Sequence, residues 1–148
     1  MGDESVKTFA VSLVLATAVL TVTPTAHADM LFGNYRLDTN RDPGHSWIWA
    51  INPCIPKAPG CANIQGVPQP NGQAAPWKVD AHLSNGRYTM AVDVPDGVRC
   101  GGAQFFPSHD VYSWDAVTLA GQVDSTFDTG CGGAPGGTTT YPFSLVRW

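Results

Sequence analysis

The sequence contains few charged residues and a single glutamate, Glu4. Charged side chains make up 14% of its 148 residues, and 12 acidic residues outnumber 8 basic ones, which gives a formal net charge of −4. Nucleic-acid binding needs a basic face, so this balance argues against a nucleic-acid partner. After residue 28, no stretch shows the i, i+3, i+4, i+7 spacing of an amphipathic helix, which argues against a helical fold.

Several motifs of catalysis and metal binding are missing as well. The nucleophile elbow G-x-S-x-G does not occur, because the nearest segment, "GHSWI" at residues 44–48, departs from it at the last position. The sequence also lacks a C-x-x-C redox pair, cysteines and histidines at zinc-ligand spacing, and a D-x-D-x-D-G calcium loop. It therefore predicts neither a metal site nor a cofactor.

The N-terminal segment has the composition of an export signal. Residues 9–22 form an apolar run too short to span a bilayer comfortably, and small residues follow at Ala26 and Ala28. We predict a signal peptide over residues 1–28, cleaved near Ala28, which leaves residues 29–148 as a single β domain without a transmembrane span. The expected location is outside the cell or in the cell envelope. An uncleaved membrane anchor is the alternative.

Four cysteines, an even number, follow the predicted cleavage site. In an exported chain such cysteines are expected to form disulfides, and three pairings are possible. We favour Cys54–Cys61 as a local link and Cys100–Cys131 as a longer one, because sequence neighbours across turns meet most easily.

One β-hairpin is strongly specified. Asn85 and Gly86 form the dipeptide typical of a two-residue type I′ turn, in which both residues need positive φ. Folding residues 78–94 there puts apolar pairs on one face and polar pairs on the other, and a one-residue slip would destroy both patterns. The apolar face pairs Leu83 with Tyr88, Ala81 with Met90 and Val79 with Val92.

The remaining chain indicates an all-β domain. Further strands are expected at residues 31–38, 46–52, 62–67 and 138–147, with two more within residues 111–127 that meet at a bend near Gly121. "PDG" at residues 95–97 is expected to be a turn. About eight short antiparallel strands joined by short turns predict a meander barrel, with a two-sheet β-sandwich as the alternative.

Tryptophan is frequent, with 5 residues in the chain. Exposed rings could stack on a sugar or line an apolar cavity, whereas buried rings would fill a small core. Trp47 and Trp49 share one face of a strand whose other face is also apolar, which favours burial. Trp114 and Tyr112 share a face of a later strand and are the better candidates for a ligand wall, so all four are candidate binding residues.

Catalytic candidates are few. Ser108, His109 and Asp110 are consecutive, but neighbours in an extended segment point apart and cannot form a triad by themselves. His109 with Asp110 is the weak catalytic candidate that remains, against solvated loop residues as the alternative. The sequence therefore leaves enzymatic activity open, and favours a protein that is not an enzyme.

Segments such as "GNYRL", "SWIWAINPC", "NGRYTMAVDVPDGVRC" and "YSWDAVTLAG" resemble a group of small exported actinobacterial proteins, especially mycobacterial ones, of unassigned activity. The resemblance implies secretion or residence in the cell envelope and nothing catalytic. The expected function is a β-barrel module that binds a small apolar or glycan ligand, and the expected partner is a lipid or glycan of the cell envelope. The alternatives are a structural or interaction protein of the envelope with a filled core, which would contact another envelope protein, and a hydrolase that uses His109.

Overall fold

The computed structural model describes residues 2, 29–70 and 74–148, so the predicted signal peptide lies outside the described residues apart from residue 2. Eight strands and one 3₁₀ turn make up the described part: β1 (Gly33–Thr39), β2 (Ser46–Pro53), β3 (Cys61–Gln69), β4 (Trp77–Ser84), β5 (Arg87–Cys100), β6 (Gln104–Asp115), β7 (Ala120–Thr129), η1 (Cys131–Gly133) and β8 (Pro135–Arg147). Among these residues, no helix is long and apolar enough to cross a membrane.

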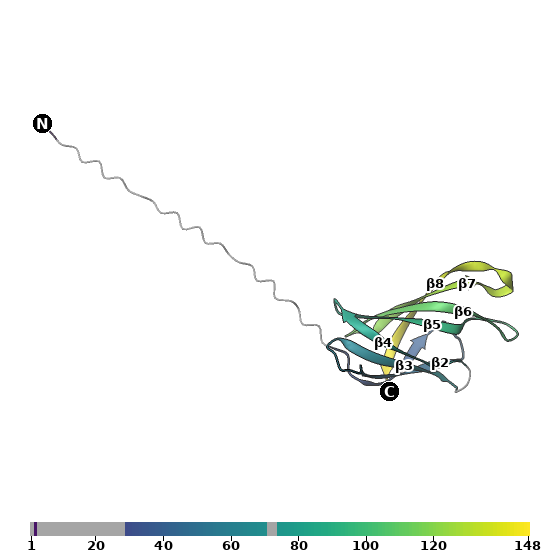
Figure 1. The fold of residues 1–148 in the computed structure, drawn as a ribbon, viewed down its shortest axis with the longest axis horizontal. Coiled ribbons are helices and arrows are strands. Elements are labelled where there is room, and N and C mark those ends of the chain that lie inside the picture. Colours follow the sequence, from purple (N-terminus) through teal and green to yellow (C-terminus); the bar gives the residue numbers. More distant parts are fainter. Residues whose placement is uncertain (1, 3–28, 71–73) are drawn as a thin grey trace.

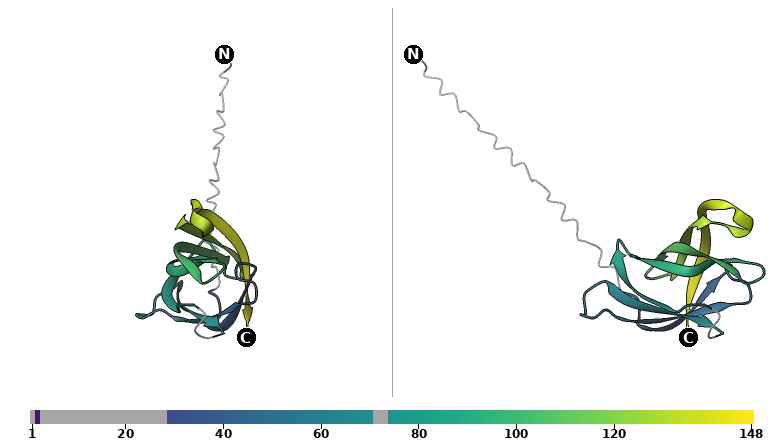
Figure 2. Two further views of the ribbon diagram at one scale, coloured as in Figure 1. Left: turned by 90° about the vertical axis from the view of Figure 1, so that its right-hand side faces the viewer. Right: turned by 45° about the vertical axis from the view of Figure 1, so that its right-hand side comes forward.

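The strands close into an antiparallel barrel, as predicted (Figures 1 and 2). Each strand pairs with the next along the chain, and β1 closes the ring by pairing with β8, where Leu37 lies opposite Leu145. Each strand of the described part therefore has a neighbouring strand on both sides, which reduces the sheet edge open to aggregation. The meander barrel is therefore confirmed over the sandwich.

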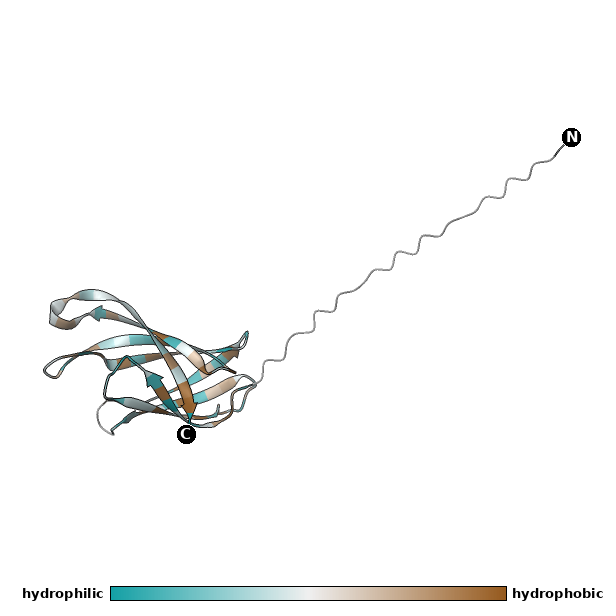
Figure 3. Cartoon of the chain, turned by 180° about the vertical axis from the view of Figure 1, so that it is seen from behind, coloured by the Kyte–Doolittle hydropathy of each residue, from teal (hydrophilic) through white to brown (hydrophobic). Residues whose placement is uncertain are grey.

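The predicted β4–β5 hairpin is present, and its register is as predicted over three residue pairs, from Ser84–Arg87 to His82–Thr89. The predicted pairs Ala81–Met90 and Val79–Val92 lie beyond this paired stretch. Leu83 lies opposite Tyr88, and the turn residues Asn85 and Gly86 have φ values of 50° and 75°. Buried and exposed residues alternate along β5 up to Val94, so one face of the strand packs inside the barrel. Figure 3 shows a similar alternation of hydrophobic and hydrophilic residues along the strands.

The prediction of a turn at residues 95–97 is wrong. The structure has a bulge there: β5 pairs with β6 as far as Val94, opposite Ser108, and pairing resumes at Val98, opposite Phe106. Proline and glycine are tolerated within a strand at a bulge, where ladder hydrogen bonds are interrupted. Pairing with β6 thus keeps the chain extended where its local sequence favours a turn.

The connection from β6 to β7 lies before Gly121, at residues 116–119, rather than at that glycine. The Asp115 carboxylate accepts hydrogen bonds from the backbone N–H groups of Val117 and Thr118, at 2.8 and 2.7 Å. These hydrogen bonds lower the pKa of Asp115. The turn ends at Leu119, which has a φ of 61°.

Both predicted disulfides are confirmed. Cys54–Cys61 closes the β2–β3 loop, and Cys100–Cys131 links the tip of the β5–β6 hairpin to η1, between β7 and β8. Their sequence separations are 7 and 31 residues. If disulfides act by restricting the unfolded chain, they stabilise the fold by about 2 and about 4 kcal/mol. The longer link fixes two hairpins that extend at one end of the barrel (Figure 1).

The barrel interior is packed with aromatic side chains. Trp49 is fully buried at its centre and meets Trp114, Tyr112 and Phe143 with ring centroids 5.4, 5.2 and 5.6 Å away. Tyr88 stacks on Trp114 from the other side, at 5.5 Å. Such tilted and edge-to-face contacts are the arrangements that aromatic rings prefer.

Substituting Gly86→Val should lower the free energy of unfolding by about 1–3 kcal/mol, because a β-branched side chain strongly disfavours positive φ. Urea denaturation measures the change. Thr89→Val is the matched control, since Thr89 is exposed on the adjacent strand of the same hairpin. A loss below about 0.5 kcal/mol for Gly86→Val would contradict the turn geometry.

Candidate functional site

The four aromatic residues that the sequence identifies as binding candidates belong to one cluster. Trp49, Tyr112 and Trp114 are buried in the barrel interior, and Trp47 is almost as well covered. Trp77 joins them, with ring centroids 6.1 Å from Trp47 and 5.7 Å from Trp49. These rings therefore form the core and, through Trp47 and Trp77, the floor of one end of the barrel.

A glycine makes room for this floor. Gly66 in β3 lies opposite both Trp49 and Trp77 in the sheet. A Cβ atom on Gly66 would come within 2.4 Å of the Trp77 indole, so only glycine lets that ring lie against the strand. The indole can thus turn toward Trp47 rather than away from the barrel.

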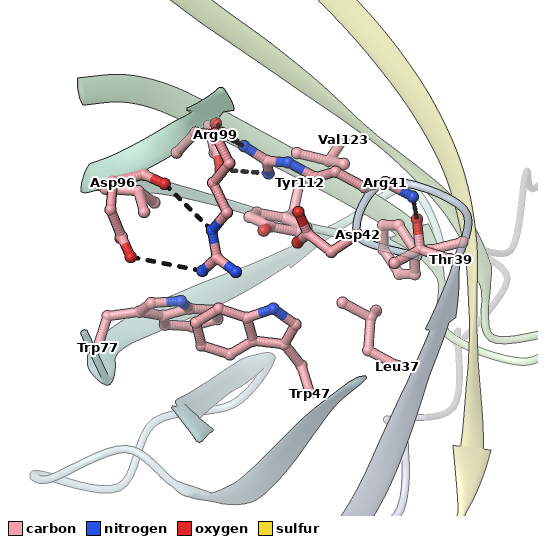
Figure 4. Close-up of a pocket in the computed structure, with 14 residues that line it drawn as sticks. Leu37, Thr39, Arg41, Asp42, Trp47, Trp77, Asp96, Arg99, Tyr112 and Val123 are labelled. Carbon is pink, nitrogen blue, oxygen red and sulfur yellow. Dashed lines mark hydrogen bonds and ion pairs between the residues drawn. The ribbon is translucent and has the colours of Figure 1, made fainter. Parts of the chain in front are cut away.

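The free space above this floor is small. A pocket of about 20 Å³ is lined by Trp47, Trp77, Tyr112, Arg41 and Arg99, among others. In Figure 4 the indoles of Trp47 and Trp77 lie on one side of it, and Arg41 and Tyr112 lie on the other. Such a volume holds about one water molecule. Among the described residues, therefore, the interior offers no room for a drug-sized ligand, which needs several hundred Å³.

A larger cleft adjoins this pocket at the end of the barrel formed by residues 40–45, 95–107 and 127–137, here called the mouth. The cleft has a volume of about 650 Å³ and lies between the β1–β2 loop, the β5 bulge and the β7–β8 hairpin. Its lining mixes aromatic, aliphatic and polar side chains, among them Arg41, Asp42, His45, Arg99, Phe127 and Tyr141. The Cys100–Cys131 disulfide fixes one wall.

An ion pair that is almost wholly buried closes the inner end of the mouth. Arg41 reaches from the β1–β2 loop to Asp110 in β6, with Nη1 2.5 Å from Oδ2. Its Nη2 donates to the Ser125 hydroxyl at 3.0 Å and to the Gly97 carbonyl at 3.1 Å. Ser108 and Ser125 both donate to Asp110 Oδ1, at 2.8 and 2.6 Å. Both Asp110 oxygens therefore have partners, as a buried charge requires.

The electrostatics of this network raise the pKa values of Arg41 and of Tyr112 beside it. Burial alone lowers the pKa of Arg41, but the hydrogen bond and charge of Asp110 outweigh it and raise the pKa above its ordinary value. Burial, together with the Asp110 charge, also raises the pKa of the neighbouring Tyr112 hydroxyl. Arg41 stays charged and Tyr112 stays protonated at neutral pH. Arg41 also lies over the Tyr141 ring, 5.5 Å from its centroid.

A second, looser ion pair lies beside the first. Arg99 Nη2 is 3.4 Å from Asp96 Oδ2, and both side chains are partly exposed. The other carboxylate oxygen, Asp96 Oδ1, is buried and has no hydrogen-bond partner among the described residues. Asp96 lines the small interior pocket (Figure 4). A buried acceptor without a partner favours a nearby hydroxyl or amide donor.

The structure separates the catalytic candidates. Ser108 and Asp110 point into the barrel, whereas His109 points outward, as alternation along a strand requires. His109 Nδ1 lies 2.7 Å from Asp93 Oδ1 on the outer surface, where the side chains are 54% and 90% exposed. In the described part of the chain, Asp93 is the one hydrogen-bond partner of this ring. Asp110 is occupied by the Arg41 network.

One group of potential metal ligands occurs among the described residues. Cys54, Cys61 and Asp80 have ligand atoms within 4.8 Å of one another. Both sulfurs are joined in the disulfide, so they are not available as thiolate ligands.

Sequence reasoning missed Arg41, Asp96, Arg99 and Tyr141. Arg41 lies in the polar segment "TNRDPGH", which has the composition of a solvated turn. The signal that could have found it is the lone acidic residue Asp110 on an inward-facing strand position, since a buried carboxylate needs a cationic partner.

Substituting Arg41→Gln should lower the free energy of unfolding by about 3–5 kcal/mol, because the Asp110 charge would stay buried without its partner. Adding Asp110→Asn to that variant should recover part of the loss. Arg36→Gln is the matched control: it breaks the exposed Arg36–Asp38 pair on β1 and should hardly change the melting temperature. Equal effects of the two arginine substitutions would contradict the buried network.

Comparison with protein-family models, with curated proteins and with solved structures finds no match for this chain. The function is therefore inferred from the geometry of the mouth and from the chemistry of the side chains that line it.

Proposed function

We propose that the protein is an exported β-barrel module that binds a small neutral glycan at the mouth of the barrel. The observation that carries this proposal is the cleft of about 650 Å³ at the mouth, which shares Arg41 and Arg99 with the small pocket lined by Trp47 and Trp77. Its volume lies in the range of small-molecule sites, and the Cys100–Cys131 disulfide fixes its wall.

The charges around the mouth favour a neutral ligand. Arg41 is paired with Asp110, and Arg99 is paired with Asp96, so neither guanidinium is left over for an anion. Asp42 adds a negative charge to the same cleft. A sugar offers hydroxyl groups that both donate and accept hydrogen bonds, together with apolar ring faces for aromatic side chains.

Individual groups in the cleft suit such a ligand. Tyr141 offers an aromatic side chain, Thr139 a hydroxyl, and Arg99 further N–H donors. The unpartnered Asp96 Oδ1 could accept a hydrogen bond from one sugar hydroxyl that enters the small interior pocket. An apolar ligand held inside the barrel is less well supported, because Trp49 and its neighbours fill that space.

The filled interior also favours a second candidate, a structural or interaction protein of the cell envelope. In this case the aromatic cluster serves stability alone, and another envelope protein would be the partner. A hydrolase that uses His109 is less well supported, because the His109–Asp93 pair lies on the exposed outer surface. General acid–base catalysis needs the histidine within reach of a bound substrate.

Glycan binding can be tested by titrating ¹⁵N-labelled protein with maltotriose, cellotriose and triacetylchitotriose. We expect one of them to shift the backbone amide signals of Thr139, Tyr141 and Arg99. Tyr141→Leu and Arg99→Gln should each weaken binding roughly tenfold. Thr140→Ala is the control, since Thr140 is exposed between Thr139 and Tyr141 on the same strand. If no sugar shifts these signals at millimolar concentration, the glycan proposal fails and the interaction protein becomes the better candidate.

Export is part of the proposal and rests on separate support. The apolar run at residues 9–22, the small residues Ala26 and Ala28, and two disulfides are typical of a protein that matures outside the cytoplasm. The resemblance to exported actinobacterial proteins agrees with this. We expect N-terminal sequencing of the protein from the culture medium or envelope to begin at Asp29. A chain that retains residues 1–28 would instead indicate an uncleaved anchor.

A further inference from the structure

We propose that the end of the barrel opposite the mouth rests on an anionic lipid surface. This end, here called the base, comprises residues 29–32, 54–60, 85–87, 115–119 and 147–148, which connect the strands or lie at their ends. The inference goes beyond glycan binding, because it concerns a separate surface at the other end of the molecule.

The base carries most of the exposed large hydrophobic side chains. The exposed fractions are 93% for Ile55, 81% for Trp148, 74% for Val117 and 65% for Leu31. Each of these residues lies in a loop or terminal segment rather than within a strand. Phe105 is the comparable side chain near the mouth, with an exposed fraction of 49%. The apolar surface is therefore concentrated at one end.

Part of this apolar surface is continuous. Phe32 lines one depression together with Lys57, Pro59 and Cys61 of the β2–β3 loop, the loop that also carries Ile55. The C-terminal segment lies beside the same N-terminal segment: Arg147 Nη2 donates to the Phe32 carbonyl at 3.5 Å. The backbone N–H of Trp148 donates to the Asn34 carbonyl at 2.9 Å. Both ends of the described domain and the disulfide loop therefore meet at the base.

The charge of the base differs from that of the whole chain. Its charged residues are Lys57, Arg87 and Arg147 against Asp29 and Asp115, whereas the chain as a whole has a net charge of −4. The Asp115 carboxylate is taken up by the backbone of its turn. Lys78 and Asp80 lie beside Ile55 and offset each other. The base is thus the weakly basic end of an acidic protein.

These features fit a lipid surface better than a flat protein interface. The apolar side chains stand on several separate loop tips, so each could enter the region between headgroups and acyl chains on its own. Tryptophan favours that region, and lysine and arginine beside it can contact anionic headgroups.

Vesicle sedimentation tests this proposal with the exported, disulfide-bonded protein. The probe is phosphatidylcholine vesicles with roughly one-quarter phosphatidylglycerol, compared with phosphatidylcholine alone. We expect sedimentation with the anionic vesicles and roughly tenfold weaker binding to the neutral ones. Ile55→Asp and Leu31→Asp should each weaken binding roughly tenfold. The melting temperatures should stay unchanged, because both side chains are exposed.

Phe105→Asp is the matched control, since it places the same charge on an exposed apolar residue near the mouth. It should leave sedimentation unchanged. The proposal is overturned if the protein does not sediment with anionic vesicles, or if Phe105→Asp weakens binding as much as Ile55→Asp. Glycan binding at the mouth is measured separately without lipid, so either proposal can fail alone.

Discussion

Trp49 fills the interior of the barrel, and this packing determines where a ligand can bind. The ring is fully buried and contacts rings from other strands on several sides, so it links opposite walls of the barrel. Because interiors are packed to nearly crystalline density, a ring of this size leaves no room for a ligand beside it. Any ligand must then bind at an end, and the two ends of this barrel differ in chemistry.

The mouth is polar and both of its arginines are paired with aspartates, whereas the base is apolar and has one more basic than acidic side chain. At the mouth, Arg41 donates hydrogen bonds to Asp110, Ser125 and the Gly97 carbonyl. Its side chain therefore closes the barrel rather than attracting an anion. The disulfide beyond it holds the two long hairpins in place. A glycan at the mouth and a lipid surface at the base would together orient the domain with its cleft away from the membrane.

Local sequence patterns predicted the structure correctly where one residue sets the backbone conformation or one buried face sets the strand register. Asn85 and Gly86 set the turn because both need positive φ, and alternation along the following strand set the register. The prediction of a turn at residues 95–97 was wrong because no single residue or face controls the conformation there. There the pairing of β5 with β6 on both sides of the segment outweighs the local preference of proline and glycine.

Strand periodicity and the proximity of sequence neighbours were enough to predict the all-β class and to favour a barrel, both disulfides and the burial of Trp47 and Trp49. The sandwich and the other cysteine pairings stayed open until the tertiary structure excluded them, and the full interior and the closure of the mouth by Arg41 are evident from that structure alone. Arg41 and Asp110 are 69 residues apart, and their contact depends on the closure of all eight strands. Neither local composition nor periodicity encodes a contact of that kind.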